Sequence, residues 1–270
     1  IAGDGQTNVL HLNTLDYDRW DVQTTDKNWL RVYSQGWFKL EDMRVNENKN
    51  RDFKFDILMG NPPFAGDIKE SRILSKYELS KNAAGKIANK VGRDILFIER
   101  NLDFLKPGGR MAIVLPQGRF NNSSDKYIRN YIAERCRILA VVGLHGNVFK
   151  PHTGTKTSVL FVQKWDEKLC PKKEDYPIFF ATMQEPSKDN SGEKIFVKKN
   201  DFPKAKKYPE QTCDPIPHYG VEPKEYNDYL LDNHGHLIVR HDLFNHEGLT
   251  KDGIAEAFAE FAKKEGLSFF

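Results

Sequence analysis

Short apolar runs recur along the first two thirds of the chain, each bounded by polar, glycine or proline residues. Runs of this length that are rich in valine, isoleucine and phenylalanine predict β-strands. The run FKFDILMG (53–60) is continuous and stops at Gly60, which is typical of a strand buried on both faces. The other expected strands are VLHLN (9–13), RMAIVLP (110–116), ILAVVGL (138–144), TSVLFVQKW (157–165) and PIFFATM (177–183).

Between these runs the apolar residues change to helical spacing. The helical stretches are 93–105, 125–136 and 252–266. The first of them places one set of apolar side chains on a single face: Ile95, Ile98, Leu102 and Leu105. It stops at the KPGG sequence of 106–109, where proline and glycine terminate a helix.

Three other stretches lack a clear period. The segment 29–40 changes character around Gln35-Gly36, which predicts a hairpin. The segment 70–89 is rich in lysine and alanine and predicts a mobile helix or loop. Lysine, proline and asparagine dominate 186–223, which predicts a loop or linker.

Strands that alternate with helices of this length predict an α/β fold with a mostly parallel sheet and helices on both of its faces. The alternation weakens after Asp166. We therefore expect a catalytic-domain portion over 1–165 and an extension with a linker and a terminal helix over 166–270.

Composition places the chain among soluble globular proteins, with 39% hydrophobic and 29% charged residues among 270. No apolar run reaches the length of a transmembrane helix, and no signal peptide is visible at the start. The three cysteines fit neither a disulfide framework nor a zinc site, so we expect a cytoplasmic protein without a metal. The net charge of +3 permits a nucleic-acid partner without requiring one.

The chemistry is concentrated in Asn61-Pro62-Pro63-Phe64, directly after the expected strand at 53–60. Ligands of open parallel sheets bind beyond the carboxyl ends of the strands. Two prolines form a stiff segment without N–H donors, so the Pro62 carbonyl and the Asn61 amide oxygen are two acceptors for an amino group. Phe64 supplies a flat face on which a base can stack.

This tetrapeptide resembles the signature of N6-adenine DNA methyltransferases. The segments from Gly92 to Lys164 are similar to the modification (M) subunit of type I restriction–modification systems, and the resemblance covers about 1–165. It implies a class I, Rossmann-like methyltransferase fold, with Asn61 and Pro62 binding the N6 hydrogens of a flipped adenine and Phe64 stacking on it. The implied partners are double-stranded DNA, a specificity subunit, a second modification subunit and a restriction subunit.

The resemblance implies S-adenosyl-L-methionine as cofactor and assigns it to Asn13, Thr14 and Leu15, with Asn13 standing where many relatives have aspartate. The family's Gly-rich DPxxGxG loop does not occur in the sequence. We therefore expect a fragment that lacks the first two strands of the family sheet, is inactive in isolation and forms the 4-5-7-6 half of the family order 3-2-1-4-5-7-6. In that half, 53–60 is followed in space by 110–116, 157–165 and 138–144.

Several alternatives remain at the level of sequence. Phe149, in the loop NVFKPHTGTKT (147–157), is expected to form a wall of the base pocket, but the loop also fits an ordinary glycine-containing connection. The nearest enzymatic rival is a methyltransferase acting on RNA or on a protein glutamine. A rival of another class is a non-catalytic remnant that binds DNA or another subunit.

Overall fold

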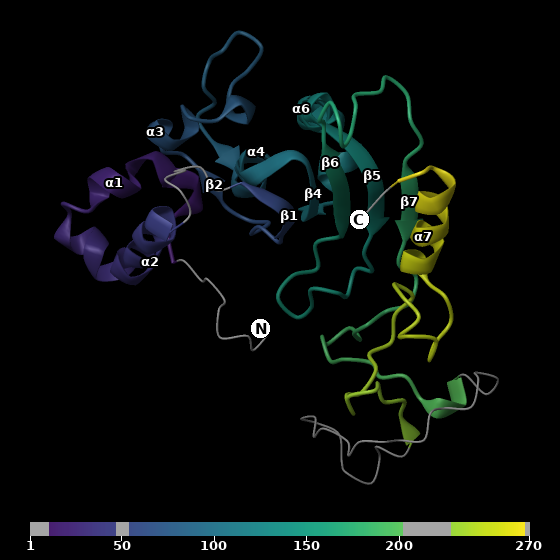
Figure 1. Cartoon of the computed structure of the whole chain (residues 1–270). Helices are drawn as coiled ribbons and strands as arrows, with labels where there is room; N and C mark the ends of the chain where they lie inside the picture. The colour runs from purple at the N-terminus through teal and green to yellow at the C-terminus, as the bar shows by residue number, and fades with distance from the viewer. Residues whose placement is uncertain (1–10, 47–53, 202–227, 268–270) are drawn as a thin grey trace. The chain divides into compact units, whose positions relative to one another are not determined.

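The computed structural model describes residues 11–46, 54–201 and 228–267 (Figure 1). It is an α/β structure with one five-stranded sheet and one two-stranded sheet. The strands are β1 (Phe55–Gly60), β2 (Asp67–Ile68), β3 (Val91–Gly92), β4 (Leu105–Pro116), β5 (Cys136–Gly143), β6 (Thr157–Lys164) and β7 (Phe179–Thr182). The helices are α1 (Trp20–Gln23), α2 (Lys27–Asn46), α3 (Ser71–Leu74), α4 (Arg93–Phe104), α5 (Gly118–Asn121), α6 (Lys126–Arg135) and α7 (Ile254–Lys264), with 3-10 helices η1 (Thr14–Arg19), η2 (Glu78–Ser80), η3 (Ser123–Asp125) and η4 (Lys199–Asp201).

The strand order of the larger sheet is β1-β4-β6-β5-β7. Its first four strands follow the expected order 4-5-7-6, so that prediction is confirmed. β1 pairs in parallel with β4, with Gly60 opposite Ile113, and β5 pairs in parallel with β7. The strand expected at 177–183 is therefore present and joins this sheet. Among the described ranges, no helix combines the length and the apolar character that crossing a bilayer requires.

The chain divides into two compact units. The first comprises 1–113, 130–136 and 163–171, and the second comprises 114–129, 137–162 and 172–270. The domain boundary that the sequence predicts after residue 165 remains a prediction.

Helix α4 supplies the core of the first unit. The apolar face predicted for 93–105 is confirmed, because its four side chains are almost fully buried: Ile95, Ile98, Leu102 and Leu105. The helix ends at Phe104, so Leu105 already belongs to β4, together with the KPGG sequence that follows it. Helix α4 lies against β1 and thereby helps to position the segment that directly follows that strand.

Strand β1 is less buried than the sequence predicts. The side chains of Phe55, Ile57 and Met59 are 44%, 67% and 83% exposed. β1 is the terminal strand in the order of the sheet. Among the described residues, α4 packs against one face of β1, and the face that carries Phe55, Ile57 and Met59 is left exposed. The prediction of burial on both faces is therefore wrong for this strand.

The hairpin predicted at 29–40 is also wrong, because these residues lie within helix α2. Trp37 and Leu40 are buried on one face of the helix and form a cluster with Leu12, Tyr17 and Trp29. Gly36 serves close packing instead of a turn. A β-carbon built on it would lie 2.6 Å from the backbone oxygen of His11.

The strand predicted at 9–13 does not form over its described part, His11–Asn13; residues 9 and 10 lie outside the described ranges. Asn13 turns the chain into η1 instead. Its carbonyl accepts a hydrogen bond from the Asp16 N–H at 3.1 Å, and its Oδ1 accepts one from the Leu15 N–H at 3.2 Å. Asparagine favours such local side-chain bonds over a strand ladder.

The segment predicted as a mobile helix or loop at 70–89 contains α3 and η2 and is held by buried side chains, including Leu74 and Tyr77, each 1% exposed. Of the loop predicted at 186–223, residues 186–201 form a turn and η4, and 202–223 lie outside the described ranges.

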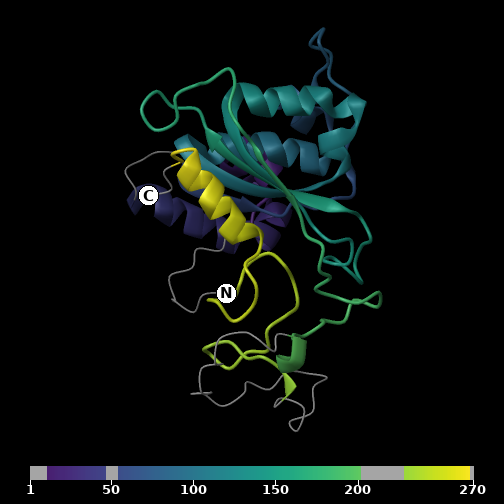
Figure 2. The ribbon, with the colours of Figure 1, turned by 90° about the vertical axis from the view of Figure 1, so that its right-hand side faces the viewer.

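In the second unit, α7 lies beside β7 (Figures 1 and 2), and aromatic rings of the two elements meet. The ring centroid of Phe179 lies 5.4 Å from that of Phe258 and 5.5 Å from that of Phe261. The helix predicted at 252–266 is therefore confirmed, and its apolar face packs on the strand predicted at 177–183.

Asp16 ties η1 to α3. Its buried carboxylate, 4% exposed, accepts hydrogen bonds from the guanidinium of Arg72 and from Lys76 Nζ at 2.7 Å. Burial alone would raise the pKa of the Asp16 carboxyl, but the hydrogen bonds and charges of Arg72 and Lys76 outweigh burial and hold this pKa below its usual value. The sequence did not single out this cluster, because its members are 56 and 60 residues apart.

We expect Gly36→Ala to destabilise the first unit. In an ordinary helix interior this substitution stabilises by about 1 kcal/mol, whereas here the new methyl group collides with the His11 backbone. Hydrogen exchange of the amides of 12–16 should become faster than in the wild type. Gln35→Ala, an exposed neighbour on the same helix, is the control, and a stabilised Gly36→Ala protein would contradict the packing described here.

We expect Asp16→Asn to lower the free energy of unfolding at pH 7 by about 1–2 kcal/mol, a value reduced because Arg72 is partly exposed. Because the folded-state pKa of Asp16 is depressed, its contribution is present above the unfolded value near 3.8 and is lost as pH falls through the folded value. Denaturant unfolding at pH 7 and in acid measures the difference, with the exposed Asp175→Asn as control. A deficit that stays constant down to the lowest pH would contradict the ion-pair assignment.

Candidate active site

Asn61-Pro62-Pro63-Phe64 follows β1 without a gap, at the carboxyl end of the strand. Asn61 is exposed, the ring of Pro62 is buried, Pro63 is exposed and Phe64 is half-buried. The buried Pro62 ring anchors the segment, because proline fixes φ and the packing fixes the ring. The amide of Asn61 therefore faces solvent on a rigid support.

Two glycines bracket the tetrapeptide, and α4 contacts both. A β-carbon on Gly60 would lie 2.8 Å from Nδ2 of Asn101, so the missing side chain lets the helix approach the end of β1. Gly66 has φ +95°, and its carbonyl accepts a hydrogen bond from the Arg93 N–H at 3.1 Å. The segment 60–66 is thus fixed at both ends by α4.

The side chain of Asn61 has no hydrogen-bond partner among residues 11–46, 54–201 and 228–267. Its amide oxygen is an acceptor available to a ligand. An exposed amide, an adjacent donor-free proline pair and an aromatic ring at Phe64 are groups that suit a planar ligand bearing an amino group. This is the chemistry that the sequence predicts for the segment.

Asn13, Thr14 and Leu15, predicted to bind the cofactor, are held by backbone contacts to other elements. Arg100 Nε donates to the Thr14 carbonyl at 3.1 Å, and the Tyr77 hydroxyl donates to the Leu15 carbonyl at 2.9 Å. Leu15 is 4% exposed, so its side chain belongs to the core, whereas Asn13 is exposed and Thr14 half-buried. Of the three, Asn13 presents the most polar surface to a ligand.

Phe149 lies in the second unit, in the loop between β5 and β6, and is half-buried. Because the tetrapeptide lies in the first unit, the predicted role of Phe149 as a wall of the base pocket remains a prediction. Among the described residues, no group of three histidine, cysteine, aspartate or glutamate side chains gathers in a way that would hold a metal ion.

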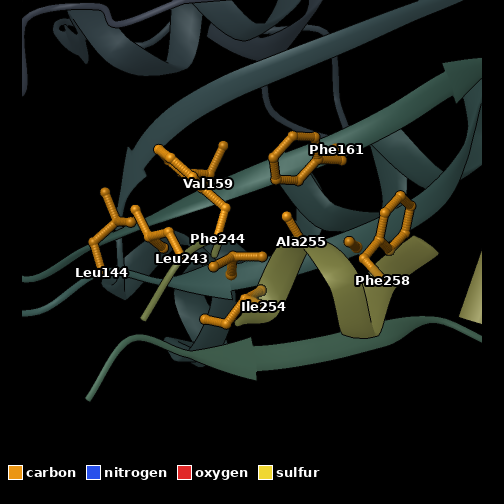
Figure 3. Close-up of a pocket in the computed structure, with 10 residues that line it drawn as sticks. Leu144, Val159, Phe161, Leu243, Phe244, Ile254, Ala255 and Phe258 are labelled. Carbon is orange, nitrogen blue, oxygen red and sulfur yellow. The ribbon is translucent and has the colours of Figure 1, made fainter. Parts of the chain in front are cut away.

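A cavity of about 320 Å³ lies in the second unit between the sheet and α7 (Figure 3). Its lining is entirely apolar and includes Val159, Phe161, Leu243, Phe244 and Phe258. Such a cavity offers no acceptors with which to orient an amino group. The candidate site is therefore the segment after β1, not this cavity.

Residues 13–227 match the N-6 DNA Methylase family. Over 114 residues the chain is 32% identical to the type I restriction enzyme EcoEI methylase subunit of Escherichia coli, covering 42% of this chain and 22% of that protein. Over 178 residues it is 26% identical to the type II restriction enzyme and methyltransferase RM.Eco57I of Escherichia coli, covering 61% of this chain and 18% of that protein.

Among solved structures, the chain is similar to a type I restriction-modification system methyltransferase subunit from Streptococcus thermophilus. The identity is 28% and the TM-score 0.35, over 45% of this chain and 26% of that one. The chain spans about a fifth of the length of the two Escherichia coli relatives. Because the family match runs over residues 13–227 of 270, the chain belongs to the N-6 DNA methylase family.

Proposed function

We propose that this chain carries the adenine-binding part of a DNA methyltransferase that transfers a methyl group from S-adenosyl-L-methionine to adenine N6 in double-stranded DNA. The observation that carries the proposal is the exposed Asn61 amide on the anchored segment 60–66, within the region that matches the family. An exposed acceptor beside a donor-free proline pair suits an exocyclic amine, and the family match favours DNA as its source.

In this proposal Asn61 and Pro62 bind the two N6 hydrogens. The lone pair of an exocyclic amine is delocalised into the ring, so the amine is a poor nucleophile. Acceptors at the Asn61 oxygen and the Pro62 carbonyl favour a more pyramidal nitrogen whose lone pair points at the methyl group. Their contribution is positioning and polarisation in a site that is rigid before the substrate arrives.

Pro63 and Phe64 act on the ring of the base. Pro63, like Pro62, has no backbone N–H, so neither proline presents a donor to the base. Phe64 stacks on the flipped adenine. Extruding a base from a duplex costs a few kcal/mol, and stacking on an aromatic side chain returns about 1–3 kcal/mol. Phe149 is proposed as a further wall of the base pocket.

S-Adenosyl-L-methionine supplies an electrophilic methyl group. Asn13 fits the adenine end of such a cofactor, because its side chain is exposed and its backbone is fixed by the turn into η1. Thr14 and Leu15 would contribute mainly through their backbone, since Leu15 is buried.

The proposed setting is the modification subunit of a type I restriction–modification system, in the cytoplasm. A specificity subunit would choose the DNA sequence, and a second modification subunit and a restriction subunit would complete the assembly. The similarity to the EcoEI methylase subunit supports this setting. Single-turnover labelling of the complete enzyme with duplex DNA, RNA and a glutamine-containing protein substrate tests the substrate class, and labelling confined to adenine in DNA is expected.

Asn61→Ala in the complete enzyme should reduce methylation about 100-fold or more, because one of the two acceptors for the amine is removed. Cofactor binding, measured by calorimetry, should stay within about two-fold of the wild type, since Asn61 contacts only the base. Asn89→Ala is the matched control, an exposed asparagine of the same unit. Methylation by Asn61→Ala at the control's rate would refute the assignment.

Phe64→Ala should weaken capture of the flipped base about ten-fold or more, whereas Phe64→Tyr should be tolerated because it keeps the stacking face. DNA with 2-aminopurine at the target position reports the extruded base by its fluorescence. Equal fluorescence changes for the alanine and tyrosine variants would show that the ring does not stack on the base.

A further inference from the structure

The loop between β5 and β6, residues 145–156, is called the Phe149 loop here. The Leu144 N–H donates to the Thr157 carbonyl at 2.9 Å and closes its base. The Phe149 carbonyl accepts a hydrogen bond from the Thr153 N–H at 3.1 Å. Phe149 therefore sits in a folded loop whose two flanks determine where the ring is placed.

Both flanks of Phe149 are held by a distant turn, residues 187–194, called the Asp189 turn here. On one side, Asn147 Nδ2 donates to the Lys188 carbonyl at 3.0 Å. On the other side, Lys188 Nζ donates to the Lys150 carbonyl at 2.7 Å. Each segment thus uses a side chain to bind the backbone of the other, two residues before Phe149 and one residue after it.

Asn190 and Gly192 add to this contact. Asn190 Oδ1 lies 3.4 Å from both Asn147 Nδ2 and Lys150 Nζ. A β-carbon on Gly192 would lie 2.6 Å from Cδ of Pro151, so a side chain at this position would displace the Phe149 loop. The two segments therefore approach each other closely at Gly192 and Pro151.

The turn owes its own shape to one carboxylate. Asp189 Oδ1 accepts hydrogen bonds from the N–H groups of Ser191, Gly192 and Glu193 at 2.9, 2.9 and 3.0 Å. The Ser191 hydroxyl donates to the same oxygen at 2.6 Å. With the Ser191 hydroxyl bond as the largest cause, these bonds hold the pKa of the Asp189 carboxyl below its usual value, so it is ionised at neutral pH.

The Asp189 turn is itself held by the C-terminal part of the chain. The Ile195 carbonyl accepts a hydrogen bond from the Arg240 N–H at 2.7 Å. Two residues further on, Val197 is buried with Leu230 and Ile238 in a small core. A chain of contacts therefore runs from this core through the Asp189 turn to the Phe149 loop, all within the second unit.

We propose that the Asp189 turn is a positioning element for Phe149, and that the described segments 184–201 and 228–250 serve catalysis by holding one wall of the adenine pocket in place. The inference rests on the proposed function, in which Phe149 contacts the flipped base. Asp189 and Gly192 act through the loop and do not touch the substrate, so they are positioning residues.

The test compares two turn variants with matched controls in the complete enzyme. Gly192→Ala pushes a methyl group toward Pro151, and Asp189→Ala removes the acceptor that shapes the turn. Gly85→Ala controls for backbone strain, because Gly85 also has positive φ in an asparagine-stabilised turn but has open space around it. Asp189→Asn is the rescue variant, since its amide oxygen still accepts the backbone N–H groups.

Both turn variants should raise hydrogen exchange in the amides of 147–153. They should also lower 2-aminopurine extrusion and kcat/KM for DNA about 10- to 100-fold, as expected for a wall displaced by about 1 Å, with cofactor affinity unchanged. Gly85→Ala and Asp189→Asn should resemble the wild type in all three measurements.

Two results overturn the proposal. Unchanged exchange at 147–153 in both turn variants would show that the turn does not hold the loop. Changed exchange with normal extrusion and kcat/KM would show that the loop is not a wall of the base pocket. Failure of the proposed function is recognised separately, by a wild-type enzyme that does not methylate adenine in DNA.

Discussion

The close approach of α4 to the segment 60–66 is the constraint on which the candidate site depends. At one end, the missing side chain of Gly60 allows Asn101 to approach closely. At the other end, the Gly66 carbonyl accepts a hydrogen bond from the Arg93 N–H. Between these two points the prolines remove backbone freedom that would otherwise have to be lost on binding. A site that orients a weak nucleophile requires this stiffness, because the acceptors must be in place before the amine arrives.

The sequence predicted those parts of the fold that local patterns specify. The helix at 93–105 depends on periodicity and the tetrapeptide at 61–64 on a short motif, whereas the four-strand order beginning with 53–60 is what the resemblance to the family sheet implies. Two predictions made from local patterns were wrong because contacts distant in sequence decide them. Gly36 was interpreted as a turn because nothing local reveals that His11 packs against it, and burial of β1 was inferred from a pattern that says nothing about its place in the sheet.

The candidate site shows the same division. Asn61 and Phe64 are predicted from four consecutive residues, whereas the partners of the Phe149 loop lie about 40 residues further along the chain. The sequence predicted few functional residues after Asp166, because the aspartates of this region accept hydrogen bonds from backbone N–H groups. Asp166, Asp189 and Asp232 each accept two or more such bonds from the turn that follows. An aspartate used in this way resembles any surface aspartate until the turn is seen.

Rigid loops matter here for an energetic reason. The cost of extruding a base is a few kcal/mol, similar to what stacking on one aromatic ring returns. Little binding free energy is therefore left to order a flexible loop, since each backbone residue that is fixed on binding costs about 1–2 kcal/mol. An enzyme of this kind therefore needs pocket walls that are ordered in advance. In the first unit α4 holds the segment after β1, and in the second unit a turn built on one carboxylate holds both flanks of Phe149, so within each unit the residues predicted to contact the base are held by contacts that form without a substrate.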